Sequence, residues 1–203
     1  MKTKWIILAV IGAFVLIVLV AVIGGYNSLV GKSQAVDSQW AQVQNVYQRR
    51  ADLIPNLVST VAGAANFEKS TLVEVTDARA SVGRVTIDAS HAPEDAAKLE
   101  EFQKSQGQLG SALSRLLVVS EQYPQLRATA NFQTLQAQLE GTENRISVER
   151  GRFNDTVRVY DISIHQFPAA LFAGMFGFRD KPYFTAIPQA QTAPTVNFPA
   201  FNK

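Results

Sequence analysis

Apolar side chains recur at alternating steps of three and four residues over most of the chain, which is the spacing of a helix that buries one face. This repeat occupies four runs, at 36–54, 58–82, 99–116 and 135–167. No run of that length shows the apolar–polar alternation of a β-strand. The pattern therefore predicts an all-α fold in which long helices pack along coiled-coil-like seams.

Residues with turn and capping preferences divide the segment 26–167 into four predicted helices. Asp52 is a good N-cap and Pro55 fits a first helical turn. Tyr123-Pro124 forces another boundary, because the residue before a proline avoids the α region. The predicted helices, roughly 26–51, 53–85, 93–122 and 125–167, favour an antiparallel up-and-down four-helix bundle. The alternative is one helix that continues through Pro55, where the repeat keeps its phase, which would leave three long helices.

Residues 5–25 contain no charged side chain and are almost entirely apolar. A helix needs about 20 such residues to cross roughly 30 Å of hydrocarbon. Trp5 and Tyr26 flank the run, where aromatic rings favour the headgroup region. A secretory signal peptide would have a shorter apolar run and a cleavage site, and a buried core helix is the other alternative. We interpret residues 1–25 as a transmembrane anchor that contacts the lipid bilayer through residues 5–25.

Charges beside the anchor predict its orientation. Lys2 and Lys4 lie on the short N-terminal side, whereas the following stretch offers Lys32 and Asp37 before Arg49. Positively charged flanks of a membrane helix stay in the cytoplasm. The bias predicts a cytoplasmic N-terminus and an extracytoplasmic domain.

Ionic residues interrupt the apolar seams at matching heights. Arg50 lies 24 residues after position 26, and Glu143 lies 24 residues before position 167. Glu68 and Arg150 each lie 17 residues before the predicted ends of their helices, at 85 and 167. Antiparallel helices would then form the structural ion pairs Arg50–Glu143 and Glu68–Arg150, which fix helix register. The alternative is that these side chains reach solvent at the edge of the bundle.

The segment 168–203 is predicted to be an irregular tail, because its prolines exclude one long helix. It is rich in aromatic rings, and so many rings are not expected to stay in water. They either pack back along the bundle or contact the membrane surface or a partner; the candidates are Phe172, Phe176, Phe178, Tyr183 and Phe184. A four-helix bundle returns the chain to the anchor, whereas a three-helix bundle places the tail at the far end.

Two strings, RRADLIPNLV at 49–58 and GTENRI at 141–146, stand out in the sequence, with Phe153-Asn154, Phe167-Pro168, Gly177-Phe178 and Pro182-Tyr183-Phe184. Together they closely resemble the bacterial LemA family, over residues 26–198. The resemblance implies an N-terminal membrane helix followed by a four-helix bundle, in the bacterial inner (cytoplasmic) membrane. The family includes a member involved in making magnetosome membranes and others that occur near membrane metalloproteases. Some descriptions of the family place the short N-terminus outside the cell, opposite to the orientation that the charges predict.

Motifs for catalysis or cofactor binding are absent from the sequence. It has no cysteine, and His91 and His165 have no second ligand at metal-binding spacing. It has no phosphate-binding glycine loop and no G-x-S-x-G elbow. Lys2 and Lys4 supply the net charge of +2, so no basic face for nucleic acid remains. We expect no catalytic residue, cofactor, metal, nucleic-acid partner or small-molecule substrate.

Two classes of function are compatible with these features. One is a membrane-anchored helical scaffold or adaptor of the bacterial cell envelope, whose molecular role is incompletely defined. Its protein partner is unknown, and the candidates are a membrane protease and a second copy of the chain. The other is an enzyme, or a regulator of a membrane protease, with a site that carries no recognisable motif. Composition favours the scaffold, so the chain is predicted not to be an enzyme. An open groove along the bundle would support the scaffold, and a compact pocket of convergent polar groups the enzyme.

Overall fold

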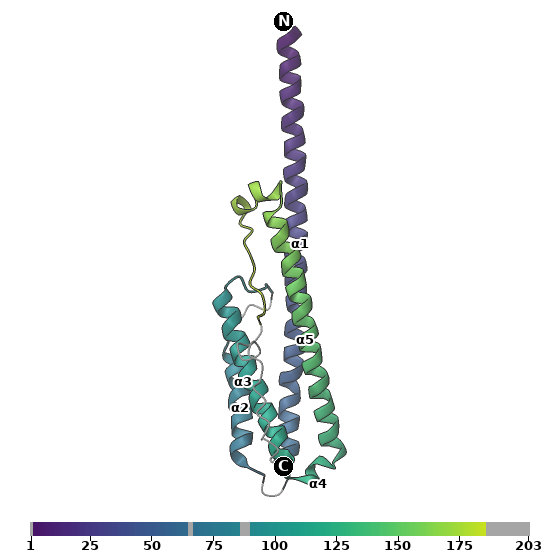
Figure 1. Cartoon of the computed structure of the whole chain (residues 1–203), viewed down its shortest axis with the longest axis vertical. Helices are drawn as coiled ribbons and strands as arrows, with labels where there is room; N and C mark the ends of the chain where they lie inside the picture. Colours follow the sequence, from purple (N-terminus) through teal and green to yellow (C-terminus); the bar gives the residue numbers. More distant parts are fainter. Residues whose placement is uncertain (1, 65–66, 86–89, 186–203) are drawn as a thin grey trace, which may run out of the picture.

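The computed structural model describes residues 2–64, 67–85 and 90–185. Every regular element within these residues is helical, which confirms the all-α prediction (Figure 1). The elements are α1 (Lys2–Ala62), α2 (Lys69–Arg84), α3 (Ala96–Ser120), the one-turn α4 (Pro124–Arg127) and α5 (Ala130–His165), followed by the 3-10 turns η1 (Ala169–Leu171) and η2 (Gly174–Phe176).

The four long helices α1, α2, α3 and α5 run in alternating directions, so each is antiparallel to the one before it (Figure 1). The second half of α1 packs closely against α5, and α2 packs against α3. These four segments form the predicted antiparallel bundle. Figure 1 shows that α1 and α5 extend beyond α2 and α3 toward the N-terminal end, where the segment after η2 runs back along them. The coiled-coil-like geometry of the seams stays a prediction.

The predicted break between the first two helices, near Asp52, is wrong because α1 continues through Pro55 to Ala62. A proline inside a helix removes one N–H, which leaves the carbonyl four residues earlier without its usual donor. That carbonyl belongs to Ala51, and it accepts a hydrogen bond from Nε of Arg79 on α2 at 3.2 Å. Pro55 itself faces solvent, so its ring disturbs no packing.

Local chemistry explains the other helix ends. α1 ends at Ala62, directly before Gly63, and α2 begins at Lys69, so the predicted boundary at 51–53 is wrong. α3 begins at Ala96, because the carboxylate of Asp95 accepts a hydrogen bond from the backbone N–H of Ala97 at 2.8 Å. The predicted fourth helix is split into α4 and α5 at Thr129, whose hydroxyl caps the N-terminus of α5.

The core has two parts, which are separated by a polar level. The membrane-proximal part includes Trp40, Phe153 and Tyr160, and the distal part includes Leu57 and Leu109. All six positions of the first predicted seam are buried on α1: Val36, Trp40, Val43, Tyr47, Arg50 and Ile54. The seam positions therefore identified the inward face of α1, and Arg50 is its one charged member.

The N-terminal part of α1 projects from the bundle (Figure 1). Among the described residues, α1 is the helix that is long and apolar enough to cross a membrane. The side chains from 3 to 21 are all exposed, which excludes the alternative of a buried core helix. An isolated apolar helix of this length is stable in lipid, where its backbone groups bond to one another and its side chains contact acyl chains.

Candidate functional site

Arg50 is the centre of the polar level between the two core parts. Its side chain is 4% exposed, yet it carries a charge. Nη1 donates to Oε1 of Glu143 at 2.7 Å, and Nη2 donates to the backbone oxygen of Gln106 at 3.3 Å and to its side-chain oxygen. The guanidinium lies 5.2 Å from the ring centroid of Tyr47. The structure thus brings Arg50 and Glu143 together, and Gln106 joins α3 to this pair.

The polar level contains one phenol, that of Tyr47, next to the guanidinium of Arg50. Burial raises the pKa of Tyr47 above its ordinary value of 10.0, although Arg150 and Arg50 lower it. The phenol is therefore protonated at neutral pH and does not act as a proton acceptor or nucleophile there. Glu143 is 49% exposed on its side chain, so its carboxylate is solvated on one side.

The predicted pair Glu68–Arg150 is wrong. Glu68 lies at the distal end of the bundle, where it precedes α2 and accepts a hydrogen bond from the hydroxyl of Ser70. Its predicted height assumed that the helix ends at 85 and 167 lie level, whereas α5 extends beyond the end of α2 toward the membrane helix (Figure 1). Arg150 donates instead to Oε1 of Gln103 on α3 at 3.0 Å and to the backbone oxygen of Thr185 at 3.1 Å.

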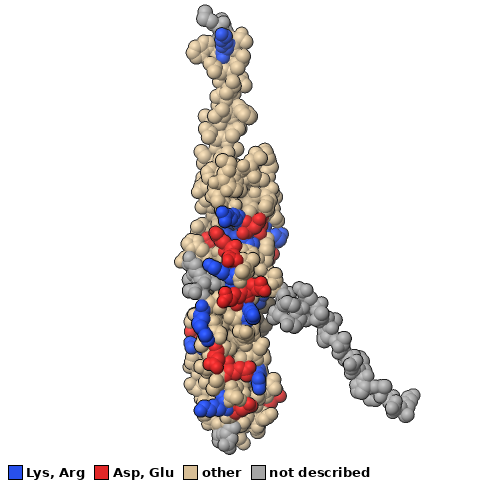
Figure 2. Space-filling view, turned by 90° about the vertical axis from the view of Figure 1, so that its left-hand side faces the viewer, with Lys and Arg blue, Asp and Glu red and all other residues tan. Residues whose placement is uncertain are grey.

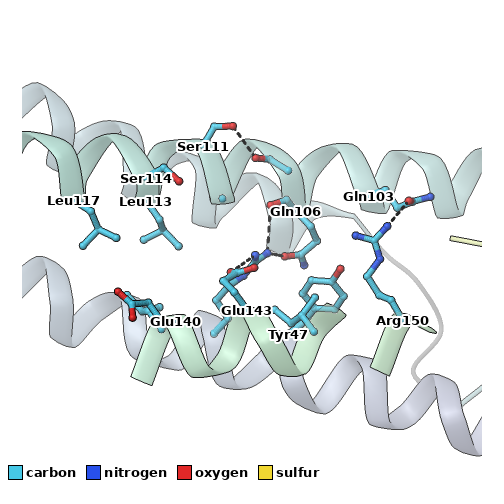
Figure 3. Close-up of a pocket in the computed structure, with 15 residues that line it drawn as sticks. Tyr47, Gln103, Gln106, Ser111, Leu113, Ser114, Leu117, Glu140, Glu143 and Arg150 are labelled. Atoms are coloured by element: carbon cyan, nitrogen blue, oxygen red, sulfur yellow. Dashed lines mark hydrogen bonds and ion pairs between the residues drawn. The ribbon is translucent and has the colours of Figure 1, made fainter. Parts of the chain in front are cut away.

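A cleft of about 630 Å³ lies between α3 and α5, and the residues of the polar level line its middle. Figure 3 shows Arg150 reaching Gln103 at one end, Glu143 and Gln106 in the middle, and Leu117 with Glu140 at the other end. The α3 wall carries small residues, and a methyl group added at Gly107 or Gly110 would meet no heavy atom within 4 Å. The remaining lining is Tyr47, Arg50, Ser111, Leu113, Ser114, Leu139 and Ile146.

The cleft is lined by apolar and ionic side chains, but these are spread along its length and do not converge on one position as in a compact active site. Its carboxylates, Glu140 and Glu143, lie one turn apart on α5, and no histidine lines it. Within the described residues no three His, Cys, Asp or Glu side chains are grouped as a metal site. This arrangement can hold an elongated apolar object and pair with charges along its edges.

The segment 179–185, which we call the strap, runs along α1 and α5 and reaches α3 at Thr185, whose backbone N–H donates to Oε1 of Gln103 at 3.3 Å. Lys181 and Asp37 form an ion pair at 3.2 Å, with side chains only 6% and 10% exposed. The side chain of Asn154 exchanges two hydrogen bonds of 2.8 Å with the backbone of Phe184. The Phe184 ring stacks on Trp40 with centroids 6.1 Å apart. The strap is therefore part of the core, as the alternative of back-packing predicted.

The segment 166–178, which we call the cap, covers the bundle end beside the membrane helix. Phe172 is 7% exposed and packs against α1 at Gly25, where an added Cβ would lie 2.6 Å from the Cζ of the ring. Any larger residue at Gly25 would have to displace that ring. Tyr26 contacts Phe176 and Phe178, with centroids 5.2 and 5.7 Å apart. The tail thus returns to the anchor.

The five predicted contact aromatics consequently divide into two groups. Phe172 and Phe184 are buried in the core, so a membrane or partner contact for these two is wrong in this fold. Phe176 is 50% exposed, Tyr183 is 39% exposed and Phe178 is half-buried. Desolvation and a hydrogen bond to Asp161 raise the pKa of Tyr183 to about 12.

Several residues that organise the polar level, the strap and the cap were not identified from the sequence. Gln106 occupied a seam position, and a polar residue there was a usable signal. Asp37 and Lys181 are 144 residues apart, and no local pattern relates them. The contact of Gly25 with Phe172 could not be predicted either, because a single glycine at the end of a membrane helix has no distinctive pattern.

Comparisons with known proteins find similar sequences in bacteria. Two magnetosome proteins of Paramagnetospirillum magneticum (strain ATCC 700264 / AMB-1), MamQ 2 and MamQ 1, are each 26% identical over 186 residues, covering 82% of this chain and 67% of the relative. MamQ of Magnetospirillum gryphiswaldense (strain DSM 6361 / JCM 21280 / NBRC 15271 / MSR-1) is 24% identical over the same shares. The family model described as LemA family matches residues 39–198, which include most of the bundle, the cap and the strap. The chain therefore belongs to the LemA family.

Proposed function

We propose that the protein is a membrane-anchored helical scaffold of the bacterial cell envelope, and that it holds a helical segment of a partner protein in the cleft between α3 and α5. The observation that carries the proposal is the form of this cleft, which is elongated, open and lined along its length instead of around a point. The magnetosome names of the relatives support a role at membranes. Composition supports a scaffold over an enzyme.

The length of the cleft suits one face of a short helix. Its lining on α3 runs from Gln103 to Leu117, which corresponds to about 21 Å at 1.5 Å per residue, or four turns. Gly107 and Gly110 keep the α3 wall low, and small residues let two helix backbones approach closely. Leu113 and Leu139 offer apolar contact, and Glu140 is available to pair with a basic residue of the partner. A helix with one apolar face in a groove is a recurrent mode of recognition.

The continuity of α1 also supports a scaffold, because it connects the bundle rigidly to the membrane segment. One helix runs from the membrane segment into the bundle, from Lys2 to Ala62, so no flexible linker separates the two. Arg50 lies 25 residues beyond Gly25, which places the polar level about 37 Å from the end of the apolar run. A partner held in the cleft would be kept at a fixed height above the bilayer.

Photo-crosslinking in native membranes tests the proposal. A photoreactive amino acid replaces Ser114, which lines the cleft, or Val148, which is 51% exposed on α5 and does not line it. We expect a defined protein adduct from position 114 that is absent from position 148. Gly107→Leu fills the cleft two turns away and should abolish the adduct.

The matched control is Gly141→Leu on α5. Gly141 also has no heavy atom within 4 Å of an added Cβ, and it lies outside the cleft lining. Both substitutions replace a helical glycine, so both should increase helix propensity by up to about 1 kcal/mol. An adduct that survives Gly107→Leu, or is lost equally with Gly141→Leu, would contradict binding in the cleft. Adduct mass would show whether the partner is a protease or a second copy.

We also propose that the anchor lies in the inner membrane with a cytoplasmic N-terminus. Lys2 and Lys4 support this orientation. A C-terminal alkaline phosphatase fusion should then be active, and protease added to spheroplasts should digest the bundle. An inactive fusion with a protected bundle would establish the opposite orientation.

A further inference from the structure

The cap buries the ring of Phe172 but leaves other large apolar side chains exposed to solvent. Phe167, Leu171 and Met175 are 83%, 71% and 85% exposed. No other large apolar side chain outside α1 is more than 64% exposed in the described part of the chain. Phe172, in the middle of the same segment, is 7% exposed. One side of the cap thus completes the core, and three of its apolar side chains point away from it.

The cap lies at the level where the apolar helix ends. Val22 and Ala169 both pack against the membrane-proximal core, and Phe172 contacts Gly25. Residues 5–25 measure about 30 Å along a helix, which equals the hydrocarbon thickness of a bilayer. When the Trp5 end lies at one headgroup region, Gly25 and the cap reach the other.

Charge defines the boundary of this surface. Residues 166–178 contain no charged side chain, and α1 has none from 5 to 31. Charges begin immediately below, with Lys32 and with Asp180, whose Oδ1 lies 2.7 Å from Nε2 of His165. Figure 2 shows the same division: the end of the body next to the projecting helix is uncharged, and acidic and basic side chains gather beneath it.

We propose that the cap is a second membrane contact, in which Phe167, Leu171 and Met175 enter the headgroup–acyl boundary beside α1. Apolar and aromatic side chains next to a membrane helix are stabilised at that depth. The lipid bilayer is the occupant because the surface is continuous with the apolar face of α1, and because it lies at the height of the membrane boundary. The inference rests on the membrane location of α1 and adds that the bundle is docked against the lipid.

The absence of cysteine from the chain provides a direct test in the full-length protein. Single substitutions Leu171→Cys and Met175→Cys are labelled with an environment-sensitive fluorophore, and the protein is reconstituted in phosphatidylethanolamine–phosphatidylglycerol vesicles. Ile23→Cys on the apolar helix is the positive control, and Val118→Cys, 64% exposed at the distal end of α3, is the negative control. These side chains are exposed, so the substitutions should not impair folding.

We expect blue-shifted emission at 171 and 175, with quenching by nitroxide-labelled lipid that approaches the quenching at 23 and exceeds that at 118. Water-like emission at 171 and 175, with quenching at 23 intact, would overturn the inference and leave the anchor standing. Blue-shifted emission without lipid quenching would show that protein, such as a second copy, covers the cap, which also overturns it. Loss of quenching at 23 would contradict the membrane anchor itself.

Discussion

The pair Arg50–Glu143 makes a prediction whose size follows from its asymmetric burial. The Arg50 side chain is 4% exposed and Glu143 is 49% exposed. Removing one partner of a fully buried pair costs about 3–5 kcal/mol. Here Gln106 keeps both of its contacts with the guanidinium, so the loss approaches that of one hydrogen bond to a charged group, about 1.5–3 kcal/mol. We expect Glu143→Ala to lower the free energy of unfolding by about 2 kcal/mol.

Replacing the cation first should remove that penalty. Arg50→Met retains a long side chain and takes the charge out of the core, and the Glu143 carboxylate that it leaves unpaired is 49% exposed and can be solvated by water. In the Arg50→Met background, Glu143→Ala changes a half-exposed side chain without a charged partner, so we expect a loss within about 0.5 kcal/mol. The difference between the two backgrounds is the coupling energy, about 1.5–2 kcal/mol.

Urea unfolding of the full chain in detergent micelles measures these values. Trp40 is buried next to Phe102 and Phe153, so its fluorescence reports the bundle once Trp5 is replaced by Phe. Equal losses for Glu143→Ala in the two backgrounds, within about 0.5 kcal/mol, would refute an energetic role for the pair.

Three further predictions concern the cap and the strap. Gly25→Leu should displace Phe172 and increase amide exchange in the cap, because the added Cβ would lie 2.6 Å from the ring; unchanged exchange would contradict this contact. Asp37→Ala leaves Lys181 buried without its carboxylate, so limited proteolysis should cleave the strap faster than in an Asp155→Ala control. The fold raises the pKa of Tyr183 from 10.0 to about 12, because it favours the protonated phenol. The contribution of this phenol to the free energy of unfolding is therefore present below pH 10 and is lost between pH 10 and 12. Tyrosine-selective NMR should show this late titration, and an ordinary pKa of 10 would exclude it.

Local periodicity predicted the parts of the fold that depend on local chemistry. The steps of three and four residues identified the buried face of α1 and placed Arg50 on it. The charge-free run identified the helix that projects from the bundle. The count of four helices also placed the tail beside the anchor. These features depend on residues near one another in sequence, where helical geometry fixes which side chains share a face.

The incorrect predictions share one physical cause, which is that distant residues decide them. Pro55 looked like a helix start, but Arg79 on α2 satisfies the carbonyl of Ala51 and lets α1 continue. Because α1 continues to Ala62 and α2 begins only at Lys69, Glu68 lies at the distal end of the bundle, away from Arg150. The burial of Phe184 depends on Trp40 and Asn154, and no spacing in the tail encodes either contact.

Hydrogen–deuterium exchange in native membrane vesicles tests the central claim most directly, with the same chain in nanodiscs free of other proteins as the reference. An occupied cleft predicts slower exchange in the native vesicles at 103–117 on α3 and 139–150 on α5, with no change on the outer helix α2. Equal exchange of these two stretches in both preparations, or protection spread evenly over α2, would contradict a scaffold that holds its partner between α3 and α5.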